Sequence, residues 1–219
     1  MKPFEKWLTQ EVESTYGIKE IEMHPVLASW LAAEEVIEED EKKLINKYRQ
    51  QLSKKAEYWN EDELKFQFIA PYLSIFNFEK ENVYTAFSRR ILSSKVKDVN
   101  NKEEILRGRV EWFVAKGKQI PTNPIFFIHE YKPSLRTTPS DPKGQLLIAM
   151  YVAQALNKDE KPLYGAYVIG KDWYFLILQG KEYALSRSYD LTQADEIEKV
   201  TKMLKRTKVY IEETLGGNA

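Results

Sequence analysis

The chain has 219 residues, of which 43% are hydrophobic and 13% aromatic, as is typical of a folded globular protein with a good core. It contains 33 basic and 33 acidic residues, so a nucleic-acid partner would have to bind a local basic patch. The chain has no cysteine, which excludes disulfides and a thiolate metal site, and its two histidines are too few for a His-rich zinc centre. It also has no apolar signal-peptide core and no apolar run long enough to span a membrane, so we expect a soluble, cytoplasmic protein with no membrane partner.

Residues 1–59 are predicted to form a charged helical extension ahead of a main domain at residues 60–219. Apolar residues at helical spacing predict a first helix that ends at Gly17 and a second, long helix over residues 25–52. The middle of the second helix is rich in charge, which is typical of a solvated face. A homodimer contact or a partner-binding arm through these helices is the alternative.

The main domain is predicted to open with a third helix. Asn60 is a good N-cap, and Glu63 stands at the third helical position, as in a capping box. Pro71 should kink or break this helix because proline lacks the N–H that a helix interior uses. Residues 82–93 then predict a strand, and the polar segment 94–104 predicts a turn.

Strands and helices follow one another through the rest of the chain. We expect strands at 110–114 and 125–132, a loop at 133–142, a helix at 142–157 capped by Asp141, strands at 163–169, 173–179 and 183–188, and a last helix at 192–214. This order predicts an α/β (α+β) fold in which a central mixed β-sheet is flanked by helices.

Charged side chains interrupt the two nearly continuous apolar strands at 110–114 and 125–132. Glu111 lies in the first strand, and Glu130 and Lys132 lie in the second, where side chains two residues apart share a face. A buried salt bridge between the strands is one interpretation. A divalent-metal site for phosphodiester hydrolysis is the other, because carboxylates hold Mg²⁺ well and a lysine can orient or activate the attacking water.

Four short segments, in this order along the chain, resemble the PD-(D/E)XK (restriction-endonuclease-like) nuclease superfamily. They are NEDELKFQFIAPYL, RGRVEW, IFFIHEYK and DPKGQLLIAMYVAQ. The resemblance covers roughly residues 60–189, and within the superfamily it is similar to the N-terminal nuclease domain of type I restriction-enzyme R subunits. It implies a Mg²⁺- or Mn²⁺-dependent endonuclease that hydrolyses DNA, in restriction or in repair.

The resemblance also implies a role for each matching residue. Glu111 and Glu130 match the two acids that bind the metal, and the carbonyl of Tyr131 matches a further ligand. Lys132 matches the catalytic lysine. Gln145 matches a helix glutamine that supports the lysine or the phosphate, so Glu111, Glu130, Lys132 and Gln145 form the expected catalytic set.

One further acid and one departure complete the comparison with the superfamily. Glu63, or alternatively Glu61, matches the acid of the opening helix that binds or orients a metal, although capping alone also explains both residues. The first strand acid is usually Asp, and Glu111 is one methylene longer. The alternative function is therefore a catalytically degenerate module of the same fold that serves in nucleic-acid binding or protein assembly.

Four arginines close to the expected site could contact DNA. Arg89 and Arg90 lie in the strand predicted at 82–93, and Arg107 and Arg109 directly precede the strand that carries Glu111. They predict a local basic rim for phosphate contacts. A solvated rim without a ligand is the alternative interpretation.

Two other candidates are weaker. His129 alternates with Glu130 and should face the other side of the sheet, where a satisfied core histidine is expected rather than a catalytic base. Lys171, Trp173 and Tyr174 could stack on bases, but aromatic residues in a hairpin more often form core or cross-strand pairs.

Overall fold

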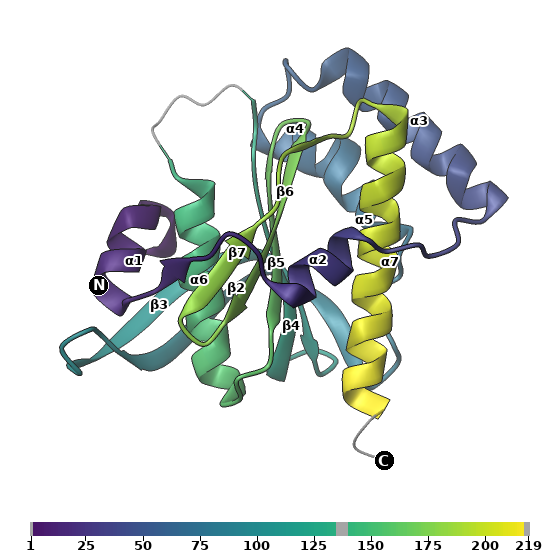
Figure 1. Ribbon diagram of the computed structural model, residues 1–219. Coiled ribbons are helices and arrows are strands. Elements are labelled where there is room, and N and C mark those ends of the chain that lie inside the picture. The colour runs from purple at the N-terminus through teal and green to yellow at the C-terminus, as the bar shows by residue number, and fades with distance from the viewer. Residues whose placement is uncertain (1, 135–139, 217–219) are drawn as a thin grey trace.

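The computed structural model describes residues 2–134 and 140–216. A central sheet lies between two layers of helices (Figure 1), so the chain has the mixed α/β fold predicted from its sequence. Among the described residues, no helix is both long enough and apolar enough to cross a membrane.

The strands are β1 (Lys19–Glu20), β2 (Tyr84–Lys97), β3 (Glu103–Lys116), β4 (Thr122–Lys132), β5 (Leu163–Ile169), β6 (Asp172–Gln179), β7 (Glu182–Leu185) and β8 (Tyr189–Asp190). The helices are η1 (Phe4–Lys6), α1 (Thr9–Tyr16), α2 (Pro25–Leu31), α3 (Glu39–Lys55), α4 (Glu61–Leu64), the π-helical η2 (Lys65–Ile69), α5 (Ala70–Ser74), α6 (Pro142–Asn157) and α7 (Ala194–Gly216).

The strands form one mixed sheet in the order β1-β7-β6-β5-β4-β3-β2, and β8 pairs with β6. The pairs β4–β5 and β1–β7 are parallel, and the other neighbouring strands are antiparallel. Helix α6 makes the connection between the parallel strands β4 and β5, as a parallel pair requires. The end of β4 and the start of α6, where the predicted site residues lie, are therefore consecutive in the chain.

Each face of the sheet has its own hydrophobic core. Helices α1 and α6 cover one face, which buries Phe113, Ile128 and Leu147, and helices α2, α3, α5 and α7 cover the other face (Figure 1). The side chains from Leu146 to Ala153 of α6 are all buried, which explains the nearly continuous apolar sequence of this helix. Because helices cover both faces, the central strands also read as apolar runs.

The predicted single helix over residues 25–52 is wrong: the chain forms α2 and α3 with a non-helical segment between them. Trp30 anchors α2, since its indole Nε1 donates to the carbonyl of Met203 on α7 at 2.8 Å. The backbone N–H of Glu38 donates to the Glu41 carboxylate at 2.7 Å, which starts α3 afresh. Tertiary contact and capping thus override the apolar spacing.

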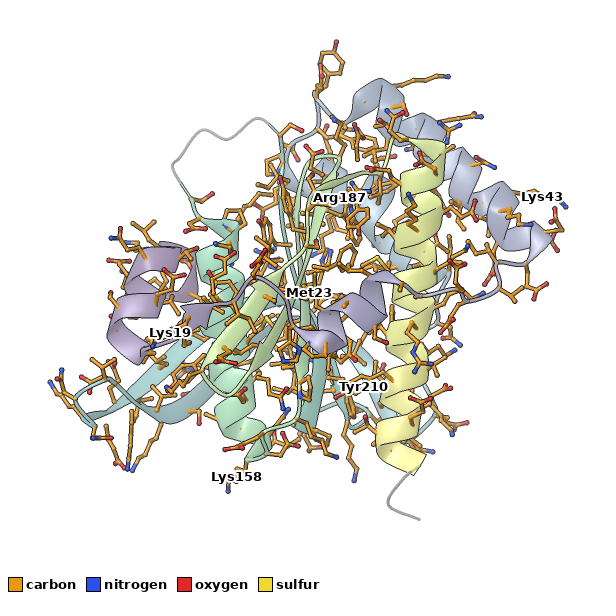
Figure 2. All side chains as sticks on the ribbon, in the orientation of Figure 1. Lys19, Met23, Lys43, Lys158, Arg187 and Tyr210 are labelled. Carbon is orange, nitrogen blue, oxygen red and sulfur yellow. The ribbon has the colours of Figure 1, made fainter. Side chains whose placement is uncertain are left out.

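The first turn of α3 carries the charged face that the sequence predicts. Lys42 pairs with Glu39 at 2.6 Å and Lys43 pairs with Asp40 at 2.8 Å, each one turn away on the same helix. Figure 2 shows Lys43 projecting away from the rest of the protein. These exposed pairs contribute little to stability because solvent screens them.

The predicted turn at 94–104 is too long. Strand β2 runs on to Lys97 and β3 begins at Glu103, so the turn is confined to residues 98–102. The Asp98 carboxylate accepts from the backbone N–H groups of Asn100 and Lys102 at 2.8 Å each. The hairpin of β2 and β3 is polar here because it is exposed to solvent, not because the whole segment is a loop.

The third helix begins as predicted. Asn60 and Glu63 form the reciprocal capping box, with both hydrogen bonds at 2.9 Å. The expected disturbance near Pro71 takes the form of the π-helical turn η2 just ahead of it. Asp141 caps α6, as predicted, by accepting from the N–H of Gly144 at 2.9 Å; of the loop expected at 133–142, residues 135–139 lie outside the described residues.

The first residues of the chain pack against the elements that build the site. The Phe4 ring lies against Gly108 of β3 so closely that a Cβ there would be only 2.1 Å from the ring. The backbone N–H and the hydroxyl of Thr9 donate to the Asp141 carboxylate at 2.7 and 2.8 Å, which ties α1 to the start of α6. Gly144 allows this approach, since a Cβ would meet the backbone of Thr9 at 2.6 Å.

Candidate active site

An open cleft of about 480 Å³ lies where β3, the end of β4, the start of α6 and the first residues of the chain meet. We call it the carboxylate cleft, and its lining residues are Pro3, Glu5, Arg89, Ile91, Arg107, Gly108, Arg109, Glu111, Lys132 and Gln145. Six of these residues are site residues that the sequence predicted, and strands β2, β3 and β4 and helix α6 bring them together. The six are Arg89, Arg107, Arg109, Glu111, Lys132 and Gln145.

Glu130 lies fully buried beside the cleft. One carboxylate oxygen accepts from Nε2 of Gln145 at 2.8 Å, and the other lies 3.4 Å from the backbone nitrogen of Glu111, which donates to it. Burial and, after it, the nearby Glu111 charge raise the pKa of Glu130 to about 8, although the Lys132 charge opposes this. Glu130 is thus protonated at neutral pH unless a cation binds nearby.

Glu111 reaches the cleft from β3, where the register pairs its neighbour Trp112 with His129 of β4. Its Oε2 accepts from the Tyr131 hydroxyl at 3.1 Å and lies 3.7 Å from Nε of Arg89. The Glu111 charge therefore already has a hydrogen-bond donor and a guanidinium as neighbours. Burial and the Glu111 charge both raise the pKa of the Tyr131 hydroxyl, so this hydroxyl stays a donor.

Lys132 lies at the end of β4 with its side chain only 15% exposed. Its Nζ is 3.2 Å from Oε2 of Glu61 on α4. Glu63, the first candidate for the acid of the opening helix, instead accepts from the backbone N–H of Asn60. The acid of this helix that contacts a predicted catalytic residue is Glu61, the alternative candidate.

Arg89 has an uncommon backbone conformation. Its φ angle is +53°, a value that few residues other than glycine adopt, although Ser88 and Arg90 on either side are in register with β3. Its side chain lines the carboxylate cleft, as do those of Arg107 and Arg109, whereas Arg90 is exposed and lies outside the cleft lining. Three of the four predicted arginines therefore lie together.

The described residues contain no group of three or more His, Cys, Asp or Glu side chains placed to hold a metal ion. Two carboxylates, those of Glu111 and Glu130, interact closely enough to affect the Glu130 pKa. Oε1 of Gln145 is buried beside them without a hydrogen-bond partner. These oxygens suit Mg²⁺, which binds proteins through one or two carboxylates and keeps several waters, rather than a closed protein cage.

The weaker candidates lie outside the lining of the carboxylate cleft, and two of them are in the core. His129 is fully buried on the other face of β4, as predicted, but neither ring nitrogen has a hydrogen-bond partner, and burial lowers its pKa to about 3. Trp173 is also fully buried, 4.9 Å from the His129 ring between ring centres, so the idea that it stacks on bases is wrong. Tyr174 stacks on Tyr167 as a cross-strand pair, and Lys171 pairs with Asp190.

The N-terminal segment is one part of the site that the sequence did not predict, and Ile91 and Gly108 are the other lining residues that it missed. Pro3 and Glu5 line the carboxylate cleft although residues 1–59 carry no recognisable site motif. The one available signal was Gly108, a glycine inside a strand, which often marks a close approach of another part of the chain.

Comparison of the chain with protein-family models gives no match, and comparison with curated proteins gives none either. The resemblance to the PD-(D/E)XK nucleases therefore stays a prediction based on the residues themselves.

Proposed function

We propose that this protein is a Mg²⁺- or Mn²⁺-dependent nuclease that hydrolyses phosphodiester bonds in DNA. One observation carries the proposal: Glu111, Lys132 and Gln145 line a single open cleft, with Glu130 buried beside them. Burying a carboxyl and an amine so close together is unfavourable unless function or pairing compensates for it. A carboxyl group with a shifted pKa beside a cleft is typical of an active site.

Glu111 and Glu130 would hold the metal, with waters and the predicted Tyr131 carbonyl completing its ligands. When bound, the metal polarises the phosphate and lowers the pKa of a water. Glu130 must lose its proton for this role, and its pKa of about 8 puts that loss within reach of neutral pH once a cation is near. Gln145 orients the Glu130 carboxylate through its 2.8 Å hydrogen bond.

Lys132 supplies the amine of the proposed site. Its pairing with Glu61 at 3.2 Å fixes the position of Nζ at the cleft wall. From there the ammonium can orient the attacking water and stabilise the charge that develops on the phosphate. Glu61 is therefore a positioning residue in this proposal.

Arg89, Arg107 and Arg109 would contact the DNA backbone. Guanidinium groups bind phosphate oxygens through paired N–H donors, and such contacts position a nucleic acid without reading its sequence. A local patch is sufficient even though the whole chain has equal numbers of basic and acidic residues. Binding through this patch should weaken as salt is added, because counterion release drives it.

Cleavage assays test the proposal directly. Plasmid and single-stranded DNA are incubated with the parent protein and with Lys132→Ala and Glu130→Gln, in Mg²⁺ or Mn²⁺. We expect cutting by the parent and a loss of about 100-fold or more in each variant, since acid–base and charge-stabilising groups contribute on this scale. Lys43→Ala and Glu39→Gln, which change exposed residues of α3, are the matched controls. No cutting by the parent, or equal cutting by all variants, would reject a nuclease.

A non-catalytic module is the second candidate, and the contacts of Glu111 favour it. The carboxylate already accepts from Tyr131 and pairs with Arg89, so a cation must compete with both. Calorimetric titration with Mn²⁺ separates the two candidates. Binding that disappears in Glu130→Gln supports the nuclease, and a parent that binds no Mn²⁺ supports the module.

A further inference from the structure

A second hollow lies on the other face of the sheet from the carboxylate cleft. It has a volume of about 320 Å³ and lies between α5 and strands β2 and β3. We call it the aromatic hollow, because Phe78, Trp112 and Tyr131 line it. Its volume is at the lower end of the range for pockets that bind small molecules, so a single ring system suits it better than a large ligand.

The aromatic walls leave a ring accessible. Trp112 is only partly buried, and its ring meets Phe78 at 5.5 Å and Phe127 at 5.8 Å between ring centres, both edge to face. Tryptophan is highly buried on average although rarely fully buried, so the exposed part of Trp112 offers a stacking surface at the wall of the hollow. A planar ligand stacked on Trp112 would complete its burial.

Three polar side chains of the hollow have no hydrogen-bond partner among the described residues, whereas Ser74 donates to the carbonyl of Pro71. The side chains of Asn77, Thr85 and Ser88 line it and form no hydrogen bond to another described residue. Lys65 also lines it, with Nζ 5.9 Å from the centre of the Tyr131 ring. Because Glu79 lines the hollow as well, a ligand with a flat apolar ring and hydrogen-bonding edges matches this combination, with any negative charge placed at Lys65.

The aromatic hollow and the carboxylate cleft are joined by a single hydrogen bond. Tyr131 lines the hollow, and its hydroxyl donates to Glu111, which lines the cleft. On β2 the two linings meet at neighbouring residues, since Ser88 lines the hollow and Arg89 lines the cleft. A polymer with a phosphate at Arg89 therefore has an adjacent group within reach of the hollow.

We propose that the aromatic hollow binds an unpaired nucleobase and that the protein prefers single-stranded DNA. This inference rests on the proposed function for the identity of the polymer. A nucleobase offers the flat ring and the hydrogen-bonding edges, and its own phosphate offers the negative charge for Lys65. A base within a duplex is stacked and paired, so it cannot enter without being flipped out.

Fluorescence anisotropy in EDTA tests base binding without cleavage. The probes are a fluorescein-labelled single-stranded oligonucleotide, the same sequence as a blunt duplex, and an abasic oligonucleotide of equal length. We expect the parent to bind the single strand at least about tenfold more tightly than the other two probes, which corresponds to roughly one stacked base.

Two variants address the hollow. Ser88→Phe fills it at an exposed strand position, where an aromatic residue suits the fold, and Trp112→Leu removes the stacking ring. Each should weaken binding of the single strand about tenfold and leave binding of the abasic probe unchanged. Ser93→Phe is the matched control, since Ser93 is an exposed serine of β2 outside both linings.

The outcomes separate this inference from the proposed nuclease activity. Equal binding of the single strand by the parent and Ser88→Phe, or no preference of the parent for the single strand over the duplex or the abasic probe, overturns the inference even if the parent cleaves DNA with Mn²⁺. Weaker binding in Ser88→Phe and not in Ser93→Phe supports the hollow even if the parent never cleaves DNA. Circular dichroism confirms that each variant is folded.

Discussion

The two faces of β4 bury polar side chains in different surroundings. On the α6 face, the carboxyl of Glu130 bonds to Gln145 and lies beside an open cleft. On the opposite face, His129 lies against Trp173 in a closed aromatic core, and neither residue has a hydrogen-bond partner for its ring nitrogens. A buried polar group thus indicates a site only where neighbouring polar groups converge on an opening; elsewhere it is a cost to stability.

The largest expected effect lies in the closed aromatic core around His129. Trp173→Ala removes a fully buried ring that packs edge to face on Tyr72 and lies against His129. We expect a loss of about 3–5 kcal/mol in the free energy of unfolding, measured by urea denaturation. Tyr58→Ala, at an exposed tyrosine, should change it by less than about 0.5 kcal/mol. A small effect of Trp173→Ala would mean that this face is less tightly packed than the structure shows.

Replacing the acid on the α6 face should stabilise the protein. The folded pKa of Glu130 is about 8, above its ordinary 4.5, so the folded state holds the proton more tightly than the unfolded state. Stability is therefore lost as pH rises from 4.5 to 8. In EDTA, Glu130→Gln should remove this loss and raise the free energy of unfolding by roughly 3 kcal/mol at pH 7. Unfolding titrations of the parent and the variant at pH 5, 7 and 8 measure how the free energy of unfolding depends on pH. The same pH dependence in both proteins would contradict the burial of Glu130.

The histidine of the closed aromatic core should respond to pH in the opposite direction. Burial lowers the pKa of His129 to about 3, so below its ordinary value of 6.5 the unfolded state takes up a proton that the folded state does not. Stability is then lost as pH falls from 6.5 towards 3, by about 2 kcal/mol at pH 5. His129→Phe should remove this acid sensitivity, as seen by comparing unfolding at pH 5 and pH 7. If His129→Phe loses as much stability at pH 5 as the parent does, His129 is not the source of the acid sensitivity.

The smallest expected effect concerns the tie between α1 and the start of α6. Asp141→Ala removes the cap on Gly144 and the two hydrogen bonds from Thr9, so we expect a loss of about 1–2 kcal/mol. Asp40→Ala on exposed α3 is the matched control and should have less effect. Hydrogen exchange should then increase in α1 more than in β4. Equal exchange in the two elements would show that the N-terminal segment is held by packing alone.

Local patterns predicted much of the fold. The capping signals at Asn60 and Asp141 and the apolar runs of β4 and α6 were recognised because they depend on neighbours in sequence. The shared face of Glu130 and Lys132 followed from strand geometry in the same way.

Long-range contacts account for what the sequence missed. Strand β1 is only two residues long and forms by pairing with β7, which no local pattern indicates. The break between α2 and α3 depends on Trp30 reaching α7, and Glu61 rather than Glu63 contacts Lys132 because capping commits Glu63 elsewhere. Each of these depends on residues far apart in the chain.

The seating of Phe4 on Gly108 matters for how the protein is purified. Pro3 and Glu5 line the cleft, so an affinity tag fused directly ahead of them would add flexible chain beside the proposed substrate site. Helix α7 ends at Gly216, well away from α1 and the start of α6 (Figure 1), so a tag on that side leaves the cleft undisturbed.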